Sequence, residues 1–224
     1  MSEKSVIIVA GGSGVRMGVS TPKQFLLLQS KPILFHTIEK FYNYDSNIEI
    51  VVVLPKAHVG TWTTLCKNHS INIYHKIVEG GAERFFSVKN GLSSLSCPKW
   101  VAIHDGVRPI VSVNLIDRCF KAAIANNSAV PVINPSETVR FGSLQDSKVI
   151  LRDNVFLVQT PQVFNYELIK KAYDVDYNSN FTDDASVYEH SGNRVLLIEG
   201  EPTNIKITKK SDVDFCDFLL SQKM

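Results

Sequence analysis

Short runs of β-branched and apolar residues alternate with longer segments of helical period along this chain, and this alternation constrains the fold most. The strand candidates are Ser5–Ala10, Ile48–Leu54, Ile71–Val78, Trp100–His104 and Ala129–Ile133. Most of these runs are apolar on both faces, as strands covered by helices on each side should be. The pattern predicts an α/β fold with a Rossmann-like, mostly parallel sheet and helices on both of its faces.

Helical periodicity fills the intervals between the strand candidates. The predicted helices lie at 34–42, 85–95, 115–126, 166–174, 184–191 and 211–220, and one more strand is expected at 194–200. Pro32 and Asn114 have the chemistry of helix starts, and Ser211, followed by Asp214, is expected to open the last helix. All 224 residues are predicted to form a single domain.

The pattern changes between Glu137 and Gln159, where short strand-like pieces are separated by turn residues. The pieces read ETVRFG, SKVILRD and VFLVQ, and the turns are Gly142-Ser143 and Asp153-Asn154. This segment predicts an antiparallel excursion from the parallel sheet, a β-arm at about 136–157.

Composition excludes several classes of protein. The chain has 24 Lys and Arg residues against 22 Asp and Glu, a formal net charge of +2, without the basic block that nucleic-acid binding requires. The sequence contains no apolar run long enough for a membrane span and no signal peptide. The four scattered cysteines read as reduced thiols. We therefore expect a cytoplasmic protein with neither nucleic-acid nor membrane partners.

A glycine-rich loop, AGGSGVRMGVSTPKQ, follows the first strand candidate from Ala10 to Gln24. It is not a P-loop, because the GK[ST] ending is absent, and it does not fit a dinucleotide-binding fingerprint. That fingerprint needs a helix starting inside the glycine motif and an acid after the second strand, whereas Pro22 interrupts here and the second strand ends in Leu54-Pro55.

Such a loop at the carboxyl end of a parallel strand suits phosphate oxygens. Its backbone N–H groups can form an anion-binding nest, and the predicted nest residues are Ala10, Gly11, Gly12 and Gly14. Arg16 adds a planar fork and Lys23 a point charge, both suited to phosphoryl oxygens. The alternative is a solvent-exposed turn with two solvated cations.

The string G-G-S-G-x-R-M-x(5)-P-K-Q resembles the signature of sugar- and polyol-phosphate nucleotidyltransferases, and most closely the methylerythritol phosphate cytidylyltransferase family. The resemblance covers almost the whole chain through Gly80–Val88, His104–Pro109, Gln159–Phe164, Thr182–Ser186 and Asn204–Thr208, in that order. It implies the nucleotidyltransferase fold. It also implies the joining of CTP to 2-C-methyl-D-erythritol 4-phosphate, giving 4-diphosphocytidyl-2-C-methyl-D-erythritol and pyrophosphate in non-mevalonate isoprenoid biosynthesis.

The resemblance also implies roles around CTP. Arg16 and Lys23 would stabilise the transition state at the α-phosphorus. Gly80, Gly81, Arg84 and Ser87 would form the base- and phosphate-recognition loop. Ala82 stands where an aspartate is common in this family, so a carboxylate role there does not carry over.

Asp105 is the expected carboxylate beside Mg²⁺, with helix capping or an ion pair to Arg108 as the alternative. His104 reads as a packed residue.

For the polyol phosphate, the resemblance implies Lys206 near the phosphates and an arm exchanged between two subunits. The implied substrate-binding residues are Asp105, Arg108, Thr138, Arg152, Thr160, Thr182 and Lys206. Arg152 and Lys206 join Arg16 and Lys23 in the implied catalytic set. Arg152 would reach the site of the neighbouring subunit in a homodimer, although without the resemblance an ion pair with Asp146 or Asp153 would be favoured. Thr182 and Asp183 are also candidates for capping the next helix.

Three other functions share features with this sequence. A ribitol 5-phosphate cytidylyltransferase would share the loop, the fold and the chemistry, and would differ in a few pocket side chains. A CTP-binding regulatory protein would keep the fold without catalysis, but it would be expected to lack loop cations, and this chain retains them. A glycosyltransferase would need D-x-D near the metal, whereas only Asp105 follows the fourth strand candidate.

Overall fold

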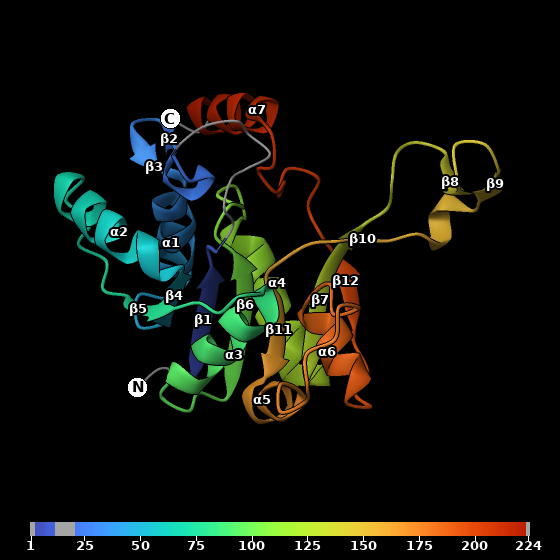
Figure 1. The fold of residues 1–224 in the computed structure, drawn as a ribbon, viewed down its shortest axis with the longest axis horizontal. Helices are drawn as coiled ribbons and strands as arrows, with labels where there is room; N and C mark the ends of the chain where they lie inside the picture. The colour runs from blue at the N-terminus through green and yellow to red at the C-terminus, as the bar shows by residue number, and fades with distance from the viewer. Residues whose placement is uncertain (1–2, 12–20, 223–224) are drawn as a thin grey trace.

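The structure is a computed structural model that describes residues 3–11 and 21–222. Its centre is an eight-stranded sheet in the order β10-β7-β11-β6-β1-β4-β5, with β12 also paired to β7. The strands of this sheet are β1 (Lys4–Val9), β4 (Glu49–Leu54), β5 (Lys76–Glu79), β6 (Trp100–Asp105), β7 (Ser128–Ile133), β10 (Leu157–Val158), β11 (Gln162–Asn165) and β12 (Leu197–Glu199). Figure 1 shows the sheet running through the middle of the molecule.

The core of the sheet is parallel, as the sequence predicts. Strand β1 pairs in parallel with β4 on one side and with β6 on the other, and β5 extends the sheet beyond β4. Strand β11 lies antiparallel between β6 and β7, while β12 runs parallel to β7. The carboxyl ends of β1, β4, β5 and β6 therefore meet at one edge, where open α/β sheets bind their ligands.

Helices cover both faces of the sheet. The helices are α1 (Ile33–Tyr44), α2 (Lys56–Asn68), α3 (Arg84–Ser94), α4 (Val113–Asn126), α5 (Tyr166–Ala172), α6 (Asp184–His190) and α7 (Lys210–Ser221). Side chains of α1, α2 and α4 pack in one core cluster with Val6 and Ile8 of β1, whereas α3, α5 and α6 pack with Ile7 on the other face. This alternation along β1 is the period-two pattern of a strand buried on both sides.

A third, smaller core cluster holds α7 over the edge of the sheet. It contains Leu28, Ile33 and Ile207 together with Cys216 of α7. Leu28 belongs to the short hairpin formed by β2 (Leu27–Leu28) and β3 (Lys31–Pro32), which follows the 3-10 turn η2 (Lys23–Phe25). Figure 1 shows α7 and this hairpin together at the top of the molecule. The packing brings the last segment of the chain beside Lys23.

Several predicted boundaries are wrong. The strand expected at Ile71–Val78 forms only from Lys76, because 71–75 adopts an irregular path. Helix α4 is capped by Ser112 rather than Asn114: the Ser112 hydroxyl accepts a hydrogen bond from Leu115 N. Helix α7 begins at Lys210, one residue before the predicted start, and α2 and β11 were not predicted. Pro32 does precede α1, as expected.

The predicted antiparallel excursion is present as a hairpin. Strands β8 (Val139–Gly142) and β9 (Ser147–Ile150) pair antiparallel, and the 3-10 turn η3 (Arg152–Asn154) follows. Figure 1 shows this hairpin standing well away from the sheet on extended links. Its apolar side chains Phe141, Leu144 and Val149 are exposed, so within one chain the hairpin buries little of its own apolar surface.

Two composition-based expectations can be compared with the structure. In the part of the chain that the structure describes, each helix is too short or too polar to cross a membrane. The four cysteines, Cys66, Cys97, Cys119 and Cys216, are free thiols. Burial raises the pKa of Cys119 and Cys216 to about 12, so both thiols stay protonated at neutral pH.

Candidate active site

A cavity of about 460 Å³ opens at the carboxyl edge of the sheet. It is lined by nine of the predicted site residues, which come from five separate segments: Ala10, Gly11, Lys23, Gly80, Gly81, Arg84, Ser87, Asp105 and Lys206. The structure thus brings these motifs together around one space. The predicted residues Gly12, Gly14 and Arg16 lie outside the described residues.

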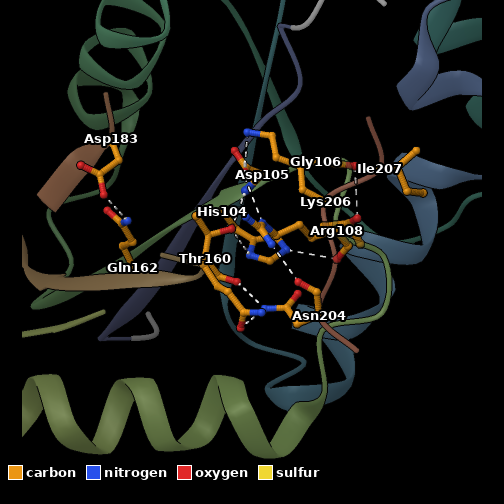
Figure 2. A network of polar contacts seen from close by, with 12 residues as sticks. His104, Asp105, Gly106, Arg108, Thr160, Gln162, Asp183, Asn204, Lys206 and Ile207 are labelled. Carbon is orange, nitrogen blue, oxygen red and sulfur yellow. Dashed lines mark hydrogen bonds and ion pairs between the residues drawn. The ribbon is translucent and has the colours of Figure 1, made fainter. Parts of the chain in front are cut away.

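Three cationic side chains surround the carboxylate of Asp105 in this cavity. It ends β6 and is 7% exposed, and Lys206 Nζ and Arg108 Nε each lie 3.1 Å from its Oδ2 atom. Arg84 Nε lies 3.9 Å from Oδ1. Burial alone would raise the pKa of Asp105, but Lys206, Arg84 and Arg108 together hold that pKa well below its usual range. The carboxylate is therefore ionised at neutral pH, and cations outnumber it (Figure 2).

Lys23 and Lys206 are held by the same stretch of chain. Lys23 Nζ donates to the carbonyl of Ile207 at 3.2 Å, and the Ile207 N–H donates to the carbonyl of Val107 at 2.9 Å. On the other side of Lys23, the side chain of Gln24 donates to the carbonyl of Ala10 at 2.8 Å. These contacts connect the end of β1, the end of β6 and the 206–207 segment, so both lysines have fixed positions at the cavity.

Arg84 opens α3 and is held by a buried carboxylate that the sequence reasoning missed. Its Nη1 and Nη2 atoms donate to Asp184 Oδ1 and Oδ2 at 2.7 and 2.6 Å. Asp184 is fully buried and also accepts a hydrogen bond from Tyr173 Oη at 2.7 Å. Burial would lower the pKa of Arg84, but the adjacent Asp184 raises it above its usual value. One hundred residues separate the two partners, so no local pattern announces the pair.

The Gly80–Gly81 loop packs tightly against the start of α3. Ser87 Oγ accepts a hydrogen bond from Gly81 N at 3.2 Å and donates to the carbonyl of Glu83 at 3.1 Å. A Cβ atom on Gly80 would lie 2.8 Å from Ser87 Oγ, and one on Gly81 would overlap Phe86 Cβ. The two glycines are therefore needed for close approach, and Ser87 fixes the loop geometry, as predicted.

A hydrogen-bonded frame supports Asp105 from behind (Figure 2). Thr160 Oγ1 accepts from Asp105 N at 3.0 Å and lies 3.0 Å from Nδ1 of His104, whose Nε2 lies 3.3 Å from the carbonyl of Arg108. The hydroxyl proton of Thr160 then points to Nδ1, which places the ring proton on Nε2. Burial lowers the pKa of His104 to about 3, so the ring is neutral and packed, as the sequence interpretation favoured.

Asn204 completes this frame. Its Nδ2 donates to the backbone carbonyl of Thr160 at 2.8 Å, and the backbone carbonyl of Asn204 accepts from Arg108 Nη1 at 2.7 Å. Asn204 is fully buried, two residues before Lys206. The frame therefore sets the distance between the segment that carries Lys206 and the end of β6.

A second cavity of about 260 Å³ adjoins the first. It is lined by five of the residues predicted to bind the second substrate, Asp105, Arg108, Thr160, Thr182 and Lys206. Arg84, Asp105 and Lys206 line both cavities. Thr182 is exposed there, whereas the adjacent Asp183 caps α6 by accepting from Ser186 N at 2.9 Å, as the sequence reasoning expected of the Thr182-Asp183 pair.

The structure does not bring Thr138 and Arg152 to either cavity of this chain. Both are exposed and lie on or beside the projecting hairpin. Arg152 Nη1 donates to the carbonyl of Ser136 at 2.6 Å, and Nε lies 4.0 Å from Asp153 Oδ1. The ion pair with Asp153 is thus present in the isolated chain, while a contact of Arg152 with another subunit stays a prediction.

Comparison with known proteins gives concordant results from sequence and structure. Residues 5–222 match the family described as 2-C-methyl-D-erythritol 4-phosphate cytidylyltransferase, IspD. A protein of that name from Bacteroides thetaiotaomicron is 45% identical over 218 residues, covering 97% of this chain and all of the relative; one from Bacteroides fragilis is 46% identical over 217 residues, covering 97% and 99%.

Solved structures with related names share the fold. The 4-diphosphocytidyl-2C-methyl-D-erythritol synthase of Anaerococcus prevotii superposes with a TM-score of 0.82 at 26% identity, covering 98% of this chain and 99% of the other. The 2-C-methyl-D-erythritol 4-phosphate cytidylyltransferase of Thermus thermophilus gives 0.80 at 29% identity, covering 99% and 100%. The similarity therefore extends over the whole fold.

Proposed function

Because this chain belongs to the 2-C-methyl-D-erythritol 4-phosphate cytidylyltransferase family, we propose that it transfers the cytidylyl group of CTP to 2-C-methyl-D-erythritol 4-phosphate. A phosphate oxygen of the polyol phosphate forms a bond to the α-phosphorus of CTP, and the bond from that phosphorus to the leaving pyrophosphate breaks. The observation that carries this proposal is the convergence of Lys23, Arg84 and Lys206 on one cavity at the carboxyl edge of the sheet.

Charge repulsion is the main obstacle to this reaction, because a dianionic nucleophile must approach a polyanion. Fixed cations reduce that repulsion and stabilise the charge that develops on the phosphoryl oxygens. Lys23 is positioned to act on the triphosphate because it is held at the cavity wall beside Ala10 and Gly11. Arg16 carries the same proposed role from the sequence, although its placement lies outside the described residues.

We place the polyol phosphate in the second cavity. Its lining residues Thr160 and Thr182 can hydrogen-bond to hydroxyl groups, and Arg108 supplies a cation. Lys206 lies on the wall shared with the first cavity, 3.1 Å from Asp105. In this position Lys206 can draw the attacking phosphate toward the α-phosphorus, which is how orientation lowers the barrier.

The carboxylate chemistry of the site fits Mg²⁺ that is bound chiefly by substrate. Among the described residues, no group of three or more His, Cys, Asp or Glu side chains could form a complete protein site. Mg²⁺ commonly binds through one carboxylate and substrate phosphates, and it then neutralises charge on the triphosphate. Asp105 is the carboxylate that would hold it, since among residues 3–11 and 21–222 its Oδ1 atom has only the 3.9 Å contact with Arg84.

A homodimer with exchanged arms follows from the same proposal. The hairpin exposes Phe141, Leu144 and Val149, and the sheet edge near β10 exposes Phe156 and Leu157. Exposed apolar surface of this kind favours association with a second copy. The exchange would also bring Arg152 to the second cavity of the neighbouring subunit. Size-exclusion chromatography with light scattering would test the dimer, and a monomer at micromolar concentration would exclude it.

The substrates are water-soluble metabolites, which supports a cytoplasmic site of action. The decisive assay is pyrophosphate release with CTP and Mg²⁺, comparing 2-C-methyl-D-erythritol 4-phosphate with ribitol 5-phosphate. We expect preference for the methylerythritol substrate and loss of turnover in Lys23→Ala. Preference for ribitol 5-phosphate would mean that the protein carries out the same cytidylyl transfer on a different polyol phosphate. Release with neither substrate, despite CTP binding, would favour a regulatory protein.

A further inference from the structure

The buried carboxylate of Asp184 has no part in the proposed reaction, yet it makes the closest charged contacts in the site. Asp184 Oδ1 and Oδ2 each accept a hydrogen bond from Arg84, at 2.7 and 2.6 Å, and Oδ1 accepts a third from Tyr173. The side chain of Asp184 is fully buried, whereas that of Arg84 is 29% exposed. One end of the pair is thus anchored inside the protein and the other reaches the cavities.

Asp184 is itself held rigidly. Gln162 of β11 is fully buried and contacts the residues on both sides of Asp184: its Nε2 donates to Asp183 Oδ2 at 2.8 Å, and its Oε1 accepts from Ala185 N at 2.9 Å. Figure 2 shows the contact between Gln162 and Asp183. Asp183 in turn caps α6. The Asp184 carboxylate is therefore fixed to the central sheet.

Arg84 stands where the two cavities meet. It lines both of them, and its Nε atom lies 3.9 Å from Asp105 Oδ1. Because Asp184 takes one N–H from each terminal nitrogen, the remaining donors of the planar guanidinium stay available to anionic oxygens. Released from Asp184, the guanidinium could turn onto Asp105, which would remove a cation from the cavities.

We propose that Asp184 is a positioning residue, which holds Arg84 at the junction of the two cavities so that the N–H groups not taken by Asp184 bind phosphoryl oxygens. Tyr173 and Gln162 act through Asp184, by holding its carboxylate in place. The proposal rests on the proposed function only in taking phosphate-bearing ligands as the occupants of these cavities.

Electrostatics alone predicts the opposite change in anion affinity, so the direction of that change tests the proposal. Asp184→Asn removes one negative charge beside the cavities, so without a positioning effect an anion should bind more tightly. If Asp184 positions Arg84, the same substitution weakens anion binding. A role in folding alone leaves anion affinity unchanged and lowers only the stability of the protein.

The probe is inorganic pyrophosphate, titrated into the full chain by calorimetry in the presence of Mg²⁺. We expect Asp184→Asn and Arg84→Gln each to weaken pyrophosphate binding by about tenfold, the value of a charge-assisted hydrogen bond. Asp184→Asn in the Arg84→Gln background should have little further effect, because Asp184 acts through Arg84. Asp214→Asn, which removes an exposed carboxylate on α7, is the matched control and should leave the affinity unchanged.

Tighter or unchanged binding in Asp184→Asn would overturn the proposal, as would additive losses in the double variant. If Asp184→Asn does not fold, Tyr173→Phe tests the same anchor, since it removes one hydrogen bond to Asp184 and leaves the ion pair. It should weaken pyrophosphate binding about twofold, and wild-type affinity would contradict the proposal. Non-additive losses of pyrophosphate affinity, without turnover of either polyol phosphate, would contradict the proposed function and support this inference. Failure of the wild type to bind pyrophosphate would overturn both.

Discussion

Among single residues, Lys206 lies on the wall that the two cavities share. Its ammonium lies 3.1 Å from Asp105 Oδ2 and its side chain is 41% exposed, so it can reach a ligand without leaving its carboxylate partner. We expect Lys206→Met to lower kcat about a hundredfold while changing KM for CTP far less, because the lost contact is one that matters most in the transition state. Steady-state pyrophosphate release would measure both constants.

Lys210→Met is the matched control for this substitution, since Lys210 is exposed at the start of α7 and four positions away. The control should retain wild-type kcat. A Lys206→Met enzyme with normal kcat and a strongly raised KM for CTP would instead assign Lys206 to ground-state binding of the nucleotide.

His104 gives a pH dependence whose sign follows from its burial. The unfolded chain protonates this residue below about pH 6.5, whereas in the folded protein its pKa is lowered to about 3. The unfolded state therefore binds the extra proton between these values, and stability falls as the pH falls through this window. At the slope for one proton, His104 should cost about 2 kcal/mol between pH 7 and pH 5.

Urea unfolding of wild type and His104→Gln at pH 7 and pH 5 would isolate this contribution. Burial also lowers the pKa of His36 and His75, but both remain in the variant and cancel in the comparison. The variant should lose about 2 kcal/mol less than wild type over the interval. Equal losses would mean that His104 is not a neutral, buried base in the folded state.

At the scale of elements, the start of α7 shows how a side-chain contact fixes the segment after Lys206. Asp212 Oδ2 accepts from Thr208 N, Thr208 Oγ1 and Lys209 N at 2.7, 2.9 and 2.9 Å. These bonds lower the pKa of Asp212, although its partial burial opposes them. We expect Asp212→Ala to lower the free energy of unfolding by about 1 kcal/mol, as the loss of a helix cap does.

Asp214→Ala tests which carboxylate stabilises the start of α7. The sequence pattern assigned the helix start to Ser211 and Asp214, whereas the structure shows Asp212 making the hydrogen bonds there. Asp214 is exposed, so its removal should change stability by less than about 0.5 kcal/mol. Thermal or urea unfolding of the two variants would decide between them. A larger loss in Asp214→Ala would support the sequence-based assignment.

The elements that the sequence predicts are those with strong periodicity. The apolar runs of β1, β4 and β6 and the stripes of α1, α3 and α4 are visible without tertiary information. Helix α2 was missed because it contains Gly60 and several threonines, and Trp62 is its only fully buried side chain among the described residues. Strand β11 has four residues, and only its pairing between β6 and β7 defines it.

The residues of the site also fall into those that the sequence predicts and those that only the fold brings together. The glycine-rich loop and the strand end predict Lys23 and Asp105 at the cavity, and the family resemblance adds Lys206; all three line it. Asp184 could not be predicted, since its importance comes from a partner one hundred residues away. The frame around Thr160 and Asn204 is equally invisible in sequence, because its bonds join three distant segments.

At the scale of the whole molecule, the position of the β8–β9 hairpin makes a prediction about how the active site is shared. Lys206 lies at the cavities of its own chain, whereas Arg152 lies beside the hairpin, which stands away from the body (Figure 1). If Arg152 acts in the neighbouring subunit, Arg152→Ala and Lys206→Met remove residues from different sides of one composite site. A mixed dimer then contains one site with both residues intact.

Mixing the two inactive variants under conditions of subunit exchange should therefore restore activity to about a quarter of the wild-type value, since half of the dimers are mixed and half of their sites are complete. Lys23→Ala mixed with Lys206→Met is the control. Both of these lysines contact the same cavity of one chain, so no site in that mixture is complete and activity should stay at the level of the single variants. No recovery in the first mixture would place Arg152 outside a shared site and leave the hairpin with a role in association alone. Recovery in the control would mean that Lys23 and Lys206 do not serve the same site.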